Sequence, residues 1–363
     1  MITLVALLSA MVVTATVSST VSTGADTTTT TVASSTTTTT SSAPPSATTT
    51  TTTTATLPGS PLPWPAAGIA AVAVPQASVA AASPRQAPRP IASLTKMMTA
   101  WVFLHHLPLA VGQRGPCVTL NAHDVAVYEH EVNTGESSAD VKVGERLCED
   151  ALLTGLLVHS AGNFAYILLR VLNMSTATFV AEMNADAKTL GLFHTHYVDI
   201  TGIGPGDRST ALDQVMMAAD LMSAQPVVRT IVVRSSALLP VAGDVISYTP
   251  FVGTQGVVGV KSGYTVPAGG CDAMAVRFSV SGVTVIGYAV VLGQPGGSSI
   301  EHAGEAALTL VHALRHYLAV RSSLEGRVVV WTGLPGDVVP TTTTTTTSTS
   351  TTTSTSTTTT LFM

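Results

Sequence analysis

Two tracts of threonine and serine limit how much of this 363-residue chain can fold. Residues 27–56 are nearly all Thr and Ser with a few Ala and Pro, and residues 341–360 are only Thr and Ser. Such tracts carry too little apolar surface to offset the entropy lost on ordering. We therefore expect extended linkers or tails there. The stretch between about residues 57 and 339 is long enough for one sizeable core, or for a domain with an inserted subdomain.

The N-terminal segment has the apolar length of an export signal. Residues 1–17 are mostly apolar, and small and hydroxyl residues follow them. The first basic residue is Arg85, so the positive region that normally precedes such a core is missing, which a start site assigned too far downstream would explain. We interpret residues 1–22 as a signal-like segment and residues 23–58 as a linker. This predicts an extracytoplasmic domain, with membrane contact only through residues 1–22 if they remain uncleaved.

Charge and cysteine content limit the possible partners and predict one disulfide. The net charge is −5, and only 10% of the residues are charged, with no cluster of Lys or Arg, which argues against a nucleic-acid partner. In an exported protein, three cysteines indicate at most one disulfide and one buried thiol. Cys117 begins a strand-like run and Cys148 follows another, so the two segments can pair in a small sheet. We expect a Cys117–Cys148 disulfide and a free Cys271.

The hydrophobic period changes along the chain from helical to strand-like. Helical spacing is expected in residues 93–107, 151–172 with an interruption at 160–163, 175–190, 210–222 and 298–320. Strands are expected in residues 66–74, 77–82, 257–260, 273–280 and 283–292. Ser281-Gly282 forms a tight hairpin between the last two. Strands at both ends with helices between them predict an antiparallel sheet of terminal strands with an inserted helical region.

A hydroxyl and an amine stand one helical turn apart where the first helical segment begins. Ser93 and Lys96 occupy positions i and i+3, which lie on one helix face, so the amine can reach the Ser93 oxygen and take its proton. This four-residue pattern alone is weak, because a helix-start serine followed by a solvated lysine has the same spacing. Ser160 and then Lys261-Ser262-Gly263 follow it in order. S-x-x-K, S-D-N and K-T-G together are the signature of class A β-lactamases and penicillin-binding proteins.

With these motifs, the chain resembles the low-molecular-mass penicillin-binding proteins, specifically the serine-type D-alanyl-D-alanine carboxypeptidases of peptidase family S11. The similarity continues between the motifs, in residues 91–100, 135–138, 179–184, 195–202, 209–211 and 259–265. The resemblance spans residues 66–324 and implies a β-lactamase/transpeptidase-like fold of the α/β (α+β) class. It assigns residues 59–326 to a penicillin-binding domain, and leaves residues 327–363 as a short Thr/Ser-rich tail.

The resemblance also implies a bacterial cell-wall reaction. Ser93 would attack the carbonyl between the two terminal D-alanines of a peptidoglycan stem peptide, with Lys96 as base, forming an acyl-enzyme that water releases. For that role Lys96 must be largely neutral near pH 7, which requires burial or a nearby cation, and Lys261 is the expected cation. Ser160 would relay a proton to the leaving amine. The resemblance implies β-lactam antibiotics as inhibitors.

Substrate binding is expected from the third motif. Lys261 and Ser262 would hold the terminal carboxylate of the substrate, at a position where Thr is more usual than Ser262, and Gly263 completes the motif. The backbone N–H groups of Ser93 and Tyr264 would form the oxyanion hole.

The second motif departs from the family pattern. The usual S-x-N is here Ser160-Ala161-Gly162-Asn163, so Gly162 occupies the position of the Asn that holds the substrate amide. Either a rearranged loop lets Asn163 serve as a substrate-binding residue, which we favour, or the polar contact is missing and turnover is weak.

The histidines and nearby acids have ordinary explanations. His194, His196 and Asp199 resemble a metal cluster, but no third basic ligand is close in sequence, so we expect no metal site and no cofactor. His159 neighbours Ser160, but adjacent helix residues point in different directions, which favours a packing or surface role. Asp199 and Asp213 are expected to be loop and cap residues.

Two other functions remain open. A β-lactamase or esterase on the same fold must hydrolyse its acyl-enzyme quickly, and a class A β-lactamase needs an E-x-x-x-N loop between the second and third motifs. No Glu between Ser160 and Lys261 is followed four residues later by Asn, which counts against it. A non-catalytic protein associated with the cell wall is the third alternative, suggested by Gly162 and the Thr-rich tails.

Overall fold

The computed structural model describes residues 62–322 of the chain. The signal-like segment 1–22, the whole linker 23–58 and the tail 327–363 lie outside the described residues. Within the described part, a five-stranded antiparallel sheet has the strand order β2-β1-β11-β10-β9. Its strands are β1 (Ile69–Val74), β2 (Val79–Ala82), β9 (Val257–Thr265), β10 (Gly269–Val280) and β11 (Val283–Gln294).

Strands from the two ends of the domain pair directly. Strand β1 runs antiparallel to β11, with Ala71 opposite Val290, so the predicted sheet of terminal strands is confirmed. The expected hairpin joins β10 to β11, and its two residues, Ser281 and Gly282, both have positive φ. Two positive φ values in succession suit the right-handed twist of the flanking strands.

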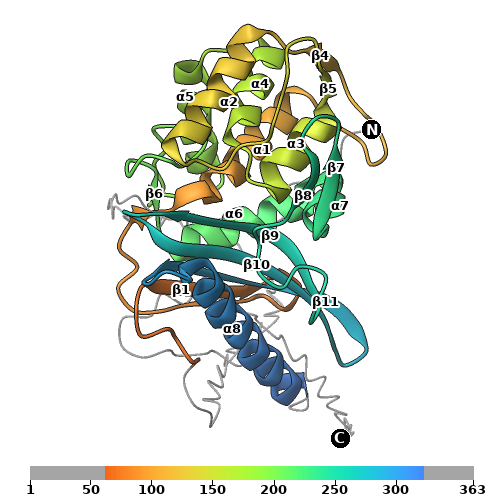
Figure 1. Cartoon of the computed structure of the whole chain (residues 1–363). Coiled ribbons are helices and arrows are strands. Elements are labelled where there is room, and N and C mark those ends of the chain that lie inside the picture. Colours follow the sequence, from red (N-terminus) through yellow and green to blue (C-terminus); the bar gives the residue numbers. More distant parts are fainter. Residues whose placement is uncertain (1–61, 323–363) are drawn as a thin grey trace, which may run out of the picture. The chain divides into compact units, whose positions relative to one another are not determined.

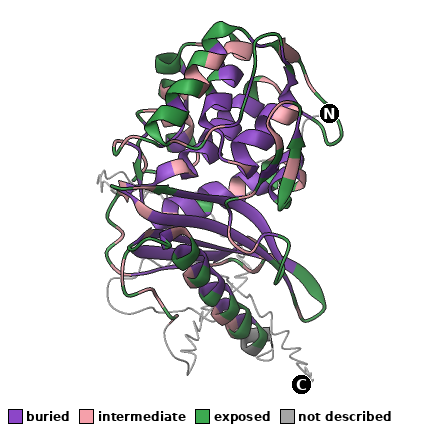
Figure 2. Ribbon diagram, viewed as in Figure 1, coloured by how far each residue is buried: buried purple, intermediate pink, exposed green. Residues whose placement is uncertain are grey.

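Both faces of the sheet are covered, which explains why its inner strands are almost wholly apolar. Along β10 the side chains alternate, so that Ala273 and Ala275 face the helical region, whereas Met274 and Val276 face α8 (Ser299–Ser322). In Figure 1, α8 crosses one face of the sheet, and α6 lies against the other. Figure 2 shows the sheet as buried, whereas the outer side of α8 is exposed.

The helical region is inserted between β2 and β9. Its helices are α1 (Thr95–His106), α2 (Ala122–Thr134), α3 (Glu149–Val158), α4 (Gly162–Leu172), α5 (Thr176–Thr189), α6 (Ala211–Ala224) and α7 (Pro226–Val232). Short 3-10 turns are η1 (Pro75–Ala77) and η2 (Ala92–Leu94). Two-stranded sheets pair β3 (Arg89–Pro90) with β6 (Arg208–Ser209), β4 (Cys117–Thr119) with β5 (Arg146–Cys148), and β7 (Ser236–Leu239) with β8 (Gly243–Ile246).

The predicted helices are confirmed, including the interruption that separates α3 from α4. The capping pattern at α6 is also confirmed, since the Thr210 hydroxyl accepts the backbone N–H of Asp213 at 3.0 Å. The prediction omitted α2, α7 and the β7–β8 hairpin.

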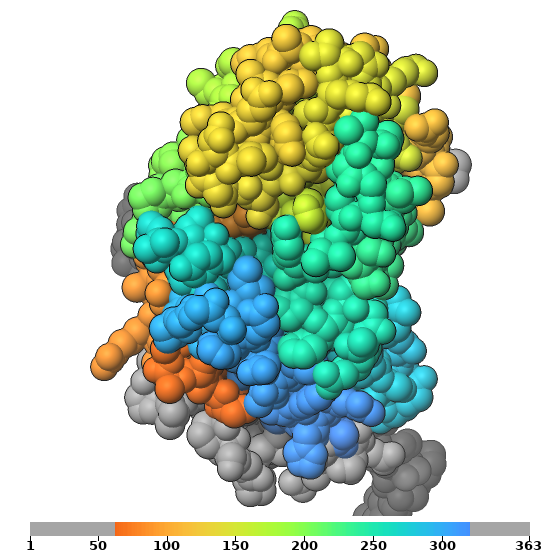
Figure 3. All heavy atoms as spheres, viewed as in Figure 1, coloured from red at the N-terminus to blue at the C-terminus, as the bar shows by residue number. Residues whose placement is uncertain are grey.

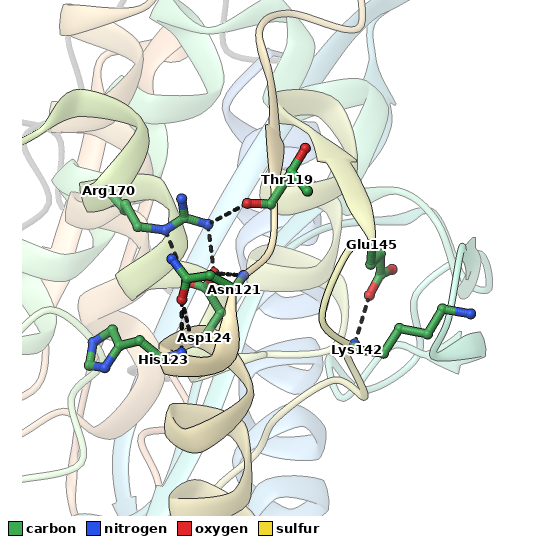
Figure 4. Close-up of polar contacts among 7 residues, drawn as sticks. All are labelled: Thr119, Asn121, His123, Asp124, Lys142, Glu145 and Arg170. Atoms are coloured by element: carbon green, nitrogen blue, oxygen red, sulfur yellow. Dashed lines mark hydrogen bonds and ion pairs between the residues drawn. The ribbon is translucent and has the colours of Figure 1, made fainter.

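An ion pair fixes α2 against α4, and this arrangement matters for the site described below. The guanidinium of Arg170 on α4 donates from Nε and Nη2 to the Asp124 carboxylate of α2, at 3.0 and 2.6 Å (Figure 4). Asp124 also closes a capping box with Asn121, which begins α2. Because Asp124 is buried and bonded in a bidentate manner, the pair holds the two helices in a defined orientation.

The expected disulfide is present. Cys117 and Cys148 stand opposite each other in the β4–β5 pair and are bonded, whereas Cys271 is free and buried. The two cysteines are 31 residues apart in sequence, and the loop that their bond closes contains α2.

Candidate active site

Ser93 and Lys96 meet as their spacing predicts. Ser93 lies in η2 and Lys96 in the first turn of α1, and the Lys96 Nζ donates to the Ser93 Oγ at 3.0 Å. A second hydrogen bond, from Nζ to the Thr201 carbonyl oxygen at 2.9 Å, fixes the amine in place. Lys96 is only 3% exposed, whereas Ser93 is partly accessible. The nucleophile is therefore reachable while its base is shielded.

Burial lowers the pKa of Lys96 from 10.5 to about 8. Desolvation disfavours the charged ammonium, and the carboxylates of Glu131, Asp199, Glu136 and Asp207, in decreasing order, oppose that effect. The sequence pointed to burial or a nearby cation, expected to be Lys261, as the cause. In the structure burial is the effect that lowers the Lys96 pKa, and the charged groups that act on it are carboxylates. Burial, and after it the positive charge of Lys96, also lowers the pKa of Lys261. With a pKa near 8, about a tenth of the Lys96 amine is neutral at pH 7, less than the largely neutral base that the resemblance implied, and this neutral fraction can accept a proton.

Strand β9 brings the third motif against the nucleophile. A Cβ atom placed on Gly263 would lie 2.6 Å from the Ser93 nitrogen, so only glycine permits this approach. The next residue, Tyr264, keeps a 49% exposed side chain, and β9 is an edge strand of the sheet. The backbone segments of Ser93 and Tyr264, whose N–H groups were expected to form an oxyanion hole, are therefore adjacent.

Lys261 and Ser262 are both buried beside this contact. The Lys261 ammonium donates to the Ser262 carbonyl oxygen at 2.6 Å, and the charges of Lys96 and Asp272 act on it. The Ser262 hydroxyl donates to the carbonyl oxygen of Tyr248 at 2.6 Å. Thus the first and third motifs come together as predicted, and the hydroxyl hydrogen of Ser262 is already donated to the Tyr248 carbonyl oxygen.

Ser160 occupies the turn between α3 and α4. Its φ of 63° lies in the left-handed region, which costs a non-glycine residue energy and is found preferentially at functional sites. The Ser160 hydroxyl oxygen is buried and has no hydrogen-bond partner among residues 62–322. A buried hydroxyl without a partner is costly unless something else satisfies it, such as a substrate.

Asn163 does not occupy the position expected of a substrate-binding residue. It is 0% exposed, its Oδ1 accepts the Ala139 N–H at 3.1 Å, and its Nδ2 donates to the Ala139 carbonyl oxygen at 2.8 Å. Because α4 begins at Gly162, residue 163 already lies in the first helical turn, and its side chain points toward the segment before β5. In this structure Asn163 holds that segment instead of reaching the site.

Glu131 takes the place beside Gly162. A Cβ atom on Gly162 would lie 2.5 Å from Oε1 of Glu131, and Oε2 accepts the Asn163 N–H at 2.7 Å. Burial raises the pKa of Glu131 to about 7. The sequence analysis missed this residue, since α2 was not predicted and no motif includes it.

The loop after α5 supplies the backbone carbonyl group of Thr201, which the sequence did not indicate as part of the site. The Asp199 carboxylate accepts the N–H groups of Thr201 and Gly202 at 2.7 and 2.5 Å, which turns the Thr201 carbonyl toward Lys96. The buried Asp207 accepts the Thr95 hydroxyl at 2.6 Å and thereby ties this loop to the start of α1. Asp199 is a loop residue, as expected, but one that positions the base.

The histidines have the ordinary positions expected of them. The ring of His159 stacks on that of Tyr248, with centroids 4.8 Å apart, and its Nδ1 lies 3.0 Å from the Ile246 carbonyl oxygen. His194 and Asp213 lie 3.7 Å apart near the start of α6, and Asp213 belongs to the cap of that helix. Among residues 62–322, no three His, Cys, Asp or Glu side chains are grouped as a metal site would require.

These contacts connect the three motifs. Strand β9 packs on the backbone of Ser93 through Gly263, and the Lys96 amine is hydrogen-bonded to the Ser93 hydroxyl. The second motif adjoins them through Glu131, which accepts the Asn163 N–H and whose charge raises the pKa of Lys96. Figure 3 shows the surface hollowed where the helical region, in yellow, meets the edge of the sheet, in teal.

Comparison with known proteins places the chain in a family. The model of peptidase family S11, described as D-alanyl-D-alanine carboxypeptidase, matches residues 66–296. The chain belongs to this family. It is 27% identical over 206 residues to D-alanyl-D-alanine carboxypeptidase DacF of Bacillus subtilis, covering 54% of this chain and 50% of the relative. It is 33% identical over 183 residues to DacB2 of Mycobacterium tuberculosis, covering 48% and 58%. The chain thus spans about half the length of these curated relatives.

The solved structures support the fold. The Streptomyces K15 DD-transpeptidase matches with a TM-score of 0.56 and 23% identity, covering 69% of this chain and 99% of that chain. Penicillin-binding protein D2 of Listeria monocytogenes, in its ampicillin-bound form, matches with a TM-score of 0.54 and 23% identity, covering 67% and 96%. The fold is therefore that of the DD-peptidases, as the sequence predicted.

Proposed function

We propose that this family member is a serine D-Ala-D-Ala carboxypeptidase that removes the terminal D-alanine of peptidoglycan stem peptides through an acyl-enzyme on Ser93. The observation that carries the proposal is the hydrogen bond of 3.0 Å between Ser93 and a buried Lys96, whose pKa is lowered to about 8. A hydroxyl needs an attached base to become a nucleophile at neutral pH, and a base with a pKa close to the working pH is the most effective.

The chemistry follows from the arrangement of these groups. Neutral Lys96 takes the Ser93 proton as Oγ attacks the carbonyl carbon between the two D-alanines. The backbone N–H groups of Ser93 and Tyr264 stabilise the negative charge that develops on the carbonyl oxygen. Collapse of this intermediate breaks the peptide bond, and the departing amine takes a proton from Lys96 through the Ser160 hydroxyl. Water then attacks the ester while Lys96 takes its proton, and Lys96 returns that proton to the Ser93 oxygen as the ester bond breaks and the shortened peptide leaves.

Lys261 and Ser262 would bind the terminal carboxylate of the substrate. The Ser262 hydroxyl has one hydrogen, which it donates to the Tyr248 carbonyl oxygen, so substrate binding must redirect that bond. The Lys261 ammonium is fully buried, and a carboxylate arriving beside it would stabilise its charged form.

Location and partners follow from the same reaction. Peptidoglycan lies outside the cytoplasm of a bacterium, and the Cys117–Cys148 disulfide is of the kind that persists in an oxidising compartment. We therefore propose an extracytoplasmic location, with β-lactams as inhibitors that acylate Ser93. No single helix within residues 62–322 is long and apolar enough to cross a membrane, and the two helix pairs that reach this length together are bent by 97° and 110°.

The test combines a fluorescent penicillin with a diacetyl-Lys-D-Ala-D-Ala peptide. Long-lived labelling of the protein, together with release of D-alanine from the peptide, is the expected result. Rapid loss of the label, with no D-alanine released, would instead identify a β-lactamase or esterase. A folded protein that takes up no label would be a non-catalytic protein of the cell wall.

A further inference from the structure

The second motif of this chain lacks an amide where the family pattern has one, and a carboxyl group fills the space. Gly162 stands at the position of the Asn in S-x-N. A Cβ atom built on Gly162 would lie 2.5 Å from Oε1 and 3.1 Å from Cδ of Glu131. At these distances a side chain at residue 162 and the Glu131 carboxylate cannot both keep their present positions, so one of them would have to move. The glycine and the glutamate therefore form a matched pair.

The Glu131 carboxyl group is held in that space. Its Oε2 accepts the Asn163 N–H at 2.7 Å, whereas its Oε1 is fully buried without a hydrogen-bond partner among residues 62–322. The side chain as a whole is 2% exposed. Helix α2, which carries it, is fixed to α4 by the bidentate Asp124–Arg170 pair. A buried oxygen held in this way needs a hydrogen-bond donor that the described residues do not supply.

Charges on several elements face this group and Lys96. Glu131 contributes the largest of the carboxylate effects on Lys96, ahead of Asp199, Glu136 and Asp207. The other ionisable groups near the two are Lys261 on β9, Tyr166 on α4, and His123 and His130 on α2. Glu131 also lines a cavity of about 370 Å³ together with Glu136 and Tyr166.

We propose that Glu131 is a positioning residue of the active site: its carboxylate takes the space of the missing Asn side chain and serves as the charge partner of Lys96. This inference rests on the proposed function for the role of Lys96 as base. Burial favours a neutral Lys96, and the negative charge of Glu131 opposes that effect, which keeps the amine basic enough to take the Ser93 proton. Since the pKa of Glu131 is about 7, the carboxylate is ionised at the pH where Lys96 titrates.

The charge partnership can be measured without any substrate. The chain has four lysines, Lys96, Lys142, Lys188 and Lys261, so lysine labelled with ¹³C at Cε gives few NMR signals, and Lys96→Ala identifies one of them. In Glu131→Gln we expect the titration midpoint of Lys96 to fall by about one pH unit, since the variant loses the carboxylate charge that favours the ammonium most. Glu136→Gln, which removes a weaker charge, should lower it less. An unchanged midpoint in Glu131→Gln would overturn the proposal.

The placement of Glu131 has its own test. Gly162→Ala puts a methyl group against the carboxylate and should destabilise the protein, whereas the same change in a Glu131→Ala background should cost much less. Additive losses of unfolding free energy in this double-mutant cycle would show that the two residues do not share the space, and would overturn the proposal.

The kinetics separate this inference from the proposed function. Acylation by a fluorescent penicillin should rise with pH in the wild type, and the rise should move to lower pH in Glu131→Gln by the shift seen for Lys96. A wild type that is never labelled would overturn the proposed function. A labelled wild type with the same pH profile as Glu131→Gln would overturn only the role of Glu131.

Discussion

The two sides of the candidate site differ in how they depart from the family pattern. On the sheet side, Lys261 to Tyr264 lie on strand β9, and Gly263 packs directly on the backbone of Ser93. On the helical side, the Asn of the second motif is absent, Asn163 is bonded to Ala139, and a glutamate from α2 fills the space at Gly162. Close backbone packing leaves the first side little freedom to vary. On the second side, the space left by a missing side chain can be filled by a residue from another element, as Glu131 of α2 does here.

The comparison predicts its largest effect at the base of the nucleophile, Lys96 on α1, where the two sides of the site meet. Lys96→Ala removes the base next to Ser93 and should lower the rate of acylation by a fluorescent penicillin at least about 10³-fold, since the general base is lost and the serine returns to its ordinary reactivity. Lys188→Ala removes an exposed lysine from α5 and serves as the matched control, which should acylate at the wild-type rate. Equal rates for the two variants would mean that Lys96 is not the base.

On the helical side, Asn163→Ala should affect stability more than chemistry. It leaves the buried N–H and carbonyl groups of Ala139 without partners, which costs about 1–3 kcal/mol of unfolding free energy. Urea denaturation measures this loss, and acylation of the folded variant should stay within about threefold of the wild type. A stable variant with a rate lowered about a hundredfold would instead return Asn163 to the substrate-binding role expected from the sequence.

The pH dependence of the acylation rate tests the interaction between Lys96 and Glu131. Lys96 accepts a proton only when it is neutral, so acylation should increase with pH through the Lys96 pKa of about 8 and level off above it. Below that pKa the rate should fall toward about tenfold per pH unit. The fall should become shallower below pH 7, where Glu131 is neutralised and no longer raises the Lys96 pKa. A rate that does not change between pH 6 and pH 9 would contradict the assignment of Lys96 as base.

The smallest effect is expected at Ser262, where the family more often has Thr. Ser262→Thr adds a methyl group and keeps the hydroxyl that is expected to bind the substrate carboxylate. We expect kcat/KM for D-alanine release to stay within about threefold of the wild type. Ser262→Ala is the informative partner variant, since it removes the hydroxyl and should raise KM.

The sequence alone indicated most of the fold, because the relevant patterns are local. The strands have apolar runs of suitable length, Ser281-Gly282 supplies the two positive φ values of a hairpin, and Thr210 begins a capping pattern. The Ser93–Lys96 contact could also be predicted, since positions i and i+3 on a helix face are neighbours whatever the rest of the chain does.

The helical side of the site could not be predicted in this way. Glu131 reaches Gly162 because α2 packs against α4, where the Asp124–Arg170 pair joins the two helices, and such packing leaves no local signature. The direction of the Asn163 side chain depends on α4 starting at Gly162, within the interruption that was expected over residues 160–163. Thr201 contributes a backbone carbonyl, which any residue could supply.

The central claim is that Ser93 is the nucleophile, and mass spectrometry of the penicillin adduct tests it most directly. The protein is trapped with a penicillin at neutral pH, digested, and searched for the acylated peptide. The account predicts a single acyl-serine at residue 93, which is absent from Ser93→Ala. An adduct on another residue, or an equally labelled Ser93→Ala variant, would contradict it.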